Sequence, residues 1–176
     1  IDIGDAVELR AHDSNISFYR RIAIEGDSYC VSATYGNVCS VIDSTNFKSL
    51  YRLPEYSLQD IFLYNGSLVR PPSMKFTVCY DYGCESAFKG CTQLTRSPKL
   101  YSVSVGQHSF ESMFDGCTAL VKAPTLKAST LSQSCYKNMF AGCSNLQSVT
   151  ILASDISASD SLNGWLQGVS PTGTLY

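Results

Sequence analysis

The chain has 176 residues, with 13 Lys and Arg against 15 Asp and Glu and a formal charge of −2. This balance argues against a protein that coats nucleic acid or binds a membrane through a polybasic patch. Only 16% of the residues are charged, against roughly 25% in ordinary soluble domains, so neutral polar residues must cover much of the surface. The composition favours an exported or virion-type binding protein over a cytosolic enzyme.

The first 46 residues are rich in β-forming residues, with turn signals at positions 13–15, 26–27 and 36–37. This pattern predicts a small antiparallel sheet over residues 1–46. Such a sheet would act as an N-terminal β cap on the open end of the segment that follows.

Four similar strings recur at a spacing of 26 residues between positions 47 and 152. Each has a Phe, then a Leu six residues later, then a closing apolar residue after six more. The repeated phenylalanines are Phe62, Phe88, Phe114 and Phe140. Because so short a unit cannot bury its own apolar face, stacked copies are expected to share one core.

Each unit predicts one short helix followed by one short strand. In the fourth unit, Cys135, Met139 and Cys143 fall on one stripe of a helix. Downstream, Val149 and Ile151 alternate with polar residues as in a half-buried strand. The expected fold is therefore α/β, a solenoid of about four helix–strand coils with a parallel sheet on one side and helices on the other.

The strings CYKNMFAGCSNLQSVTI and FESMFDGCTALVKAPTLKASTL resemble the BspA-like leucine-rich repeats of gut and oral Bacteroidetes. Units of that family follow a pattern of CY, MF, GC, L, AP and a closing L. The resemblance covers residues 47–152, although the first unit carries Ile61, Tyr64 and Asn65 in place of Met, Gly and Cys. It implies a leucine-rich-repeat solenoid that serves in binding or adhesion on a bacterial surface or on a phage of these bacteria.

Residues 153–176 contain a further apolar stripe of helical spacing, followed by Pro171 and Gly173, which would end a helix. Its members are Leu162, Trp165, Leu166 and Val169. We expect a C-terminal cap in which Trp165 covers the last coil. The chain then divides into a cap (1–46), a solenoid (47–152) and a second cap (153–176).

The cysteines favour a structural role. Cys91, Cys117 and Cys143 share one repeat position, at which the first unit has Asn65. The position therefore requires a small, partly polar, buried side chain, and we expect mostly reduced, inert thiols. A disulfide between Cys30 and Cys39, on adjacent predicted strands, is the alternative.

Catalytic and metal-binding patterns are absent from the sequence. His12 and His108 are the only histidines, and neither is accompanied by a nucleophile and an orienting acid at matching repeat positions. The cysteines lack the short pairs of a structural zinc site, and no Gly-rich phosphate loop follows a strand. We therefore expect no enzyme, no cofactor and no metal.

A basic column is predicted on the outward side of the strands. Arg70, Arg96 and Lys122 occupy one repeat position, followed by Ser148 in the fourth unit. Adjacent strands would place the three cations within roughly 10 Å. These charges could simply discourage edge pairing, or they could bind an anionic partner. Four further cations lie near enough in sequence to widen the column: Arg52, Lys75, Lys99 and Lys127.

Two functions remain open from the sequence. The first is a non-catalytic adhesion module, extracellular, on a cell surface or on a virion fibre, that binds a protein or anionic glycan through its strand face. The second is a structural spacer or assembly domain of a larger virion or envelope protein. Neither involves nucleic acid or membrane insertion.

Overall fold

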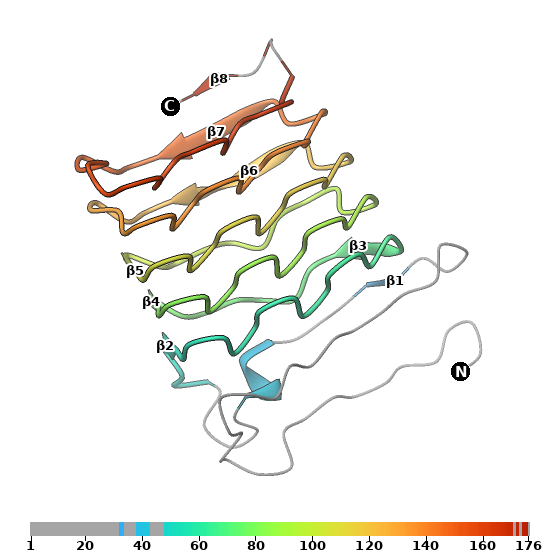
Figure 1. The fold of residues 1–176 in the computed structure, drawn as a ribbon. Coiled ribbons are helices and arrows are strands. Elements are labelled where there is room, and N and C mark those ends of the chain that lie inside the picture. Colours follow the sequence, from blue (N-terminus) through green and yellow to red (C-terminus); the bar gives the residue numbers. More distant parts are fainter. Residues whose placement is uncertain (1–31, 34–37, 43–47, 171, 173, 176) are drawn as a thin grey trace.

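The computed structural model describes residues 32–33, 38–42, 48–170, 172 and 174–175. From residue 48 onward, successive 26-residue units lie side by side, each containing a run of turns and a short extended segment (Figure 1). The antiparallel sheet expected in residues 1–46 lies largely outside the described residues. Within that segment the structure describes β1 (Ser32–Ala33), which pairs in parallel with β3, and the 3₁₀ helix η1 (Val38–Val41).

All described strands are short and pair in parallel, in three separate sheets. They are β1 with β3 (Leu68–Arg70); β2 (Arg52–Leu53), β4 (Val78–Cys79) and β5 (Ser104–Val105) in that order; and β6 (Lys122–Leu126), β7 (Ser148–Ile151) and β8 (Thr174–Leu175). In the second sheet Val78 lies opposite both Arg52 and Ser104. The 26-residue spacing therefore sets the strand register.

The predicted helix–strand leucine-rich-repeat solenoid is wrong. The described residues contain no α-helix, and their strands form three small sheets instead of one continuous sheet. Segments that were expected to be helical are five runs of ten turn residues each, here called turn rows one to five. They span residues 55–64, 81–90, 107–116, 133–142 and 159–168.

Backbone hydrogen bonds show why a turn row is not a helix. The N–H groups of Gln59, Ile61 and Leu63 donate to the carbonyl three residues earlier and close successive β-turns. The N–H groups between them leave the row, and that of Phe62, for example, donates to the carbonyl of Ala87 in the next row at 2.9 Å. An α-helix would instead satisfy every N–H within the segment, four residues back.

Each row also has three residues at positive φ, spaced four apart. In row one they are Tyr56, Asp60 and Tyr64, each at a φ of 56°, which suits the third position of a type II turn and not a helix. In later rows the third of these residues is glycine. At Gly90 an added Cβ would lie 2.3 Å from the Tyr64 ring, so the close approach of the rows also requires glycine there.

The turn rows nevertheless bury the same apolar residues whose spacing suggested helices. In row three Phe110, Met113 and Phe114 are fully buried, and Cys117 just after the row is buried as well. A repeat of four residues per pair of turns and a helical repeat of 3.6 place nearly the same residues inward over a ten-residue segment. Periodicity alone therefore could not separate the two structures.

A column of phenylalanine rings runs through the core. The centroids of Phe62, Phe88, Phe114 and Phe140 are separated by 5.2, 5.6 and 5.7 Å, with neighbouring planes within 10° of parallel. All four side chains are buried. The 26-residue spacing predicted this alignment, and stacking at these distances adds to the stabilisation from burial.

The fifth row lies in the segment expected to form a cap and is the last row that the structure describes. Trp165 is half-buried and packs against the core, together with Leu162, Leu166 and Val169. The residues here form turns and not the expected helix. No helix in the described part of the chain is long and apolar enough to span a membrane.

Far-ultraviolet circular dichroism tests the correction from helices to turns. Because the described residues hold no α-helix, the spectrum of the chain is expected to lack the paired minima of a helical protein. A spectrum with the strong paired minima expected from one helix in each unit would contradict the turn rows.

Replacing the central phenylalanine tests the ring column. Phe114→Ala removes a fully buried side chain that stacks on two others, and we expect it to lower the free energy of unfolding by about 3–5 kcal/mol. Urea denaturation measures the change. The exposed Gln93→Ala serves as control, and equal stability of the two variants would show that the column is not core.

Candidate functional site

A groove with a volume of about 790 Å³ lies between two adjacent extended segments, residues 95–101 and 121–127. At one end the segments meet in an isolated parallel bridge between Arg96 and Lys122. Beyond this bridge no backbone hydrogen bond joins residues 97–101 to residues 123–127, all of which are described. Next to the bridge, the Ser97 hydroxyl donates to the Lys122 carbonyl at 3.3 Å.

Two prolines at the same repeat position explain why the segments separate. Pro98 and Pro124 both line the groove, and neither has an N–H to continue a ladder between them. In the next unit Thr150 takes this position, and there pairing resumes, with Thr125 opposite Thr150 in β6 and β7. The groove therefore follows from a repeated proline in the sequence.

The groove has an apolar floor and a basic rim. Pro98, Leu100, Ala123 and Pro124 are buried beneath it. Its exposed cations are Arg96, Lys99, Lys122 and Lys127, and no Asp or Glu lines it. In a chain of net negative charge, this is a local concentration of positive potential that favours an anion.

One aromatic ring stands within the basic rim. Tyr101 is 39% exposed, and the Lys127 Nζ lies 5.2 Å from its ring centroid. Such a cation–π contact is worth about 0.5–1 kcal/mol at an exposed site. It positions the lysine beside a flat apolar surface, so that charge and ring can contact one ligand together.

The structure brings some of the sequence-predicted site residues together. Arg96 and Lys122 line the groove side by side. Ser148 pairs with Lys122 across β6 and β7 but lies outside the lining, and Arg70 ends β3, also outside it. The predicted four-member column therefore contributes two residues to the groove.

Of the four cations expected from the sequence to widen the column, Lys99 and Lys127 line the groove, whereas Arg52 and Lys75 lie outside it. The sequence prediction did not include Tyr101. A signal was present, because Tyr101 and Lys127 are 26 residues apart and so occupy one repeat position. The paired prolines were a second signal, since neither can donate an N–H to a ladder between these two segments.

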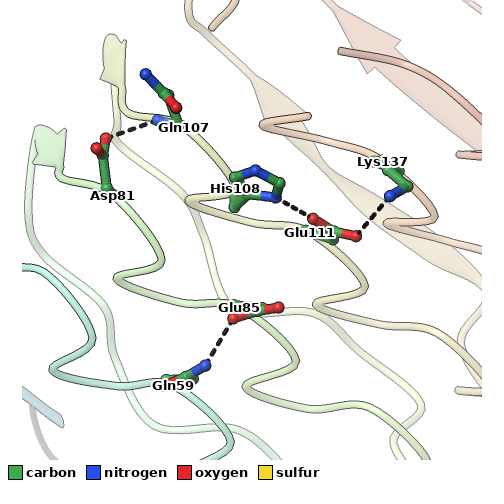
Figure 2. A network of polar contacts seen from close by, with 7 residues as sticks. All are labelled: Gln59, Asp81, Glu85, Gln107, His108, Glu111 and Lys137. Carbon is green, nitrogen blue, oxygen red and sulfur yellow. Dashed lines mark hydrogen bonds and ion pairs between the residues drawn. The ribbon is translucent and has the colours of Figure 1, made fainter. Parts of the chain in front are cut away.

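A polar network connects the turn rows on a different part of the molecule (Figure 2). Gln59 Nε2 donates to Glu85 Oε2 at 2.6 Å, His108 Nδ1 contacts Glu111 Oε2, and Lys137 Nζ lies 3.2 Å from Glu111 Oε1. Partial burial raises the pKa of Glu85, the Gln59 hydrogen bond opposes this, and the Glu111 charge adds to it. These side chains are partnered with one another, so the network links adjacent rows.

Three buried thiols complete backbone hydrogen bonding between units. Sγ of Cys91, Cys117 and Cys143 donates to the carbonyls of Phe62, Phe88 and Phe114, at 3.1, 3.1 and 3.0 Å. Burial raises the pKa of Cys91 and of Cys143 from 9.0 to about 12 and also raises that of Cys117. The thiols therefore stay protonated and keep donating.

The remaining cysteines fit no metal site in the described residues, where no group of three or more metal-ligating side chains occurs. Cys79, Cys84 and Cys135 are free and buried. Cys30 lies outside the described residues, so the disulfide between Cys30 and Cys39 stays a prediction.

Comparison of the chain with protein-family models, with curated proteins and with solved structures returned no match. The resemblance to BspA-like proteins therefore stays a prediction.

Alkaline denaturation tests the thiol donors. Since the pKa of Cys143 is raised on folding, its stabilising contribution is complete below its unfolded pKa and is lost as the pH rises through its folded pKa. Between about pH 9 and 12, each such thiol makes the free energy of unfolding fall by up to about 1.4 kcal/mol more per pH unit. Urea melts at pH 8, 9 and 10 should show a shallower pH dependence for Cys143→Ala.

The exposed Ser144→Ala is the matched control and should keep the slope of the parent. Parallel slopes for the parent and for Cys143→Ala would contradict protonated thiol donors at this position.

Proposed function

We propose that this chain is a non-catalytic binding module that takes an anionic, extended partner, such as a sulfated or uronic glycan, in the groove between residues 95–101 and 121–127. The observation that carries the proposal is the lining, with four cations, one exposed aromatic ring and no acidic residue. Basic side chains attract sulfate and carboxylate groups, and an aromatic face packs against the apolar face of a sugar ring.

The shape of the groove favours an extended ligand. Arg96 and Lys122 lie at the bridge, whereas Lys99 and Lys127 lie three and five residues further along their segments. The charges are thus distributed along the groove, which suits a chain with regularly spaced anions better than a single small ion. Buried Pro98 and Ala123 supply an apolar floor that needs no polar partner.

A structural or assembly role is the second candidate, and one observation favours it. In turn row five, alternate backbone N–H groups have no acceptor in the described part of the chain. Backbone donors that lack an acceptor within the described residues suit contact with a further polypeptide segment.

Charge reversal within the groove tests the binding proposal. The triple variant Arg96→Glu, Lys99→Glu, Lys122→Glu replaces three exposed cations, and we expect its affinity for a heparin or alginate oligosaccharide to fall at least about tenfold. Isothermal titration calorimetry measures the affinity. Raising the salt concentration should also weaken parental binding, since the Debye length falls to about 8 Å near physiological ionic strength.

The control is Arg52→Glu, Arg70→Glu, Lys75→Glu, which changes the net charge equally at three exposed positions outside the groove. It should bind within about threefold of the parent. Equal losses in both variants would indicate attraction by overall charge, and unchanged binding in the groove variant would refute the groove as the site.

A further inference from the structure

Three pairs of exposed side chains follow one another along the groove, with one member of each pair on each wall. The two members are 26 residues apart, and the residues between successive pairs are buried except for the half-buried Ser97. The first pair is Arg96 with Lys122, the second is Lys99 with Thr125, and the third is Tyr101 with Lys127. The first pair forms the bridge and the third makes the cation–π contact, so the two walls stay in register between them.

The four cations in these pairs form no ion pair with a carboxylate of the described residues. Lysines of the turn rows do have such partners, as Lys89 has in Asp115 at 2.9 Å and Lys137 has in Glu111 at 3.2 Å. Positive charge in the groove is therefore available to an anion from outside the described chain.

The three pairs offer different chemistry in a fixed order. Arg96 and Lys122 place two positive charges side by side, which suits one sulfate or carboxylate group held by both. Lys99 and Thr125 supply one charge and one hydroxyl. In the third pair a charge lies beside a flat ring, which suits a sugar that has both an apolar face and an anionic group.

We propose that an anionic oligosaccharide lies along the groove in one direction, with its most highly charged end at the first pair and a sugar ring at the third. This inference rests on the groove being the binding site proposed above. Five residues separate the first pair from the third on each wall, a span of about 16 Å at about 3.3 Å per extended residue. A ligand must therefore be several sugar residues long to reach both ends.

Tyr101 then determines which kind of polyanion binds more tightly. A polyphosphate chain carries charges but no sugar ring, so it can contact the cations and gains nothing from the tyrosine. An oligosaccharide of similar charge gains the ring contact as well. The groove therefore selects a carbohydrate among extended polyanions.

Heparin fragments of increasing length, added to the unmodified chain, give the first test. In NMR titrations a disaccharide should shift the amide signals of Arg96 and Lys122, where the charge is densest, whereas a hexasaccharide should also shift those of Tyr101 and Lys127. Isothermal titration calorimetry should show at least about tenfold higher affinity for the hexasaccharide, since it reaches all three pairs. Equal shifts at both ends with the disaccharide, or equal affinities, would overturn the proposed direction.

Tyr101→Ala gives the second test, because it removes the ring and keeps every cation. The hexasaccharide should bind this variant about fivefold more weakly than the parent, whereas the disaccharide and an inorganic polyphosphate should bind it equally well. Tyr101→Phe keeps the ring and should bind like the parent. The matched control is Tyr80→Ala, which removes an exposed ring outside the groove lining and should leave all three affinities unchanged.

The outcomes separate this inference from the proposed function. If Tyr101→Ala weakens the hexasaccharide and the polyphosphate equally, or weakens neither, the role of Tyr101 is overturned while the groove remains the site. If the parent binds none of the oligosaccharides, the groove itself is refuted, and this inference with it. Should Tyr101→Ala fail to fold, the length series on the unmodified chain decides.

Discussion

Most of this structure depends on the alternating direction of backbone hydrogen bonds in the turn rows. Every second N–H closes a turn within its own row, and the N–H groups between them donate to the following row, as Phe88 does to Met113 at 2.9 Å. A single row would leave half of its donors unpaired in a position where the core excludes water. Stability therefore belongs to pairs of neighbouring rows and not to any one of them.

The cysteine at the repeat position shared by Cys91, Cys117 and Cys143 also serves to pair buried backbone groups between units. The carbonyl of Phe88 receives the N–H of Cys91 from its own row and the thiol of Cys117 from the next unit, the latter at 3.1 Å. A buried carbonyl has two lone pairs, and a small side chain with one weak donor can use the second. Burial then keeps the thiol protonated, which makes it inert as a nucleophile and suitable as a structural donor.

Interruption of the backbone ladder between residues 95–101 and 121–127 leaves the groove that we propose to be functional. Pro98 and Pro124 remove donors on the strand side, and the groove lined by cations lies between the two segments that carry them.

Sequence patterns alone determined the features that depend on spacing. The 26-residue period predicted the column from Phe62 to Phe140, the shared buried position of Cys91 and Cys117, and the closeness of Arg96 to Lys122. Each of these needs only that equivalent residues of successive units lie side by side. Tyr101 was missed because its role depends on a groove, and the groove depends on where pairing stops.

The path of the backbone within each unit was decided only in the tertiary structure. Apolar residues three and four apart suit an α-helix and a row of turns equally, and the prediction of helices was wrong because the choice between them is not local. Residues such as Tyr56, Asp60 and His108 adopt positive φ, which is unfavourable for an isolated residue. They hold it because the N–H of each donates to a carbonyl of the following row, as His108 does to Gln133, while its C=O closes a turn within its own row. A single unit read from its sequence does not contain that following row.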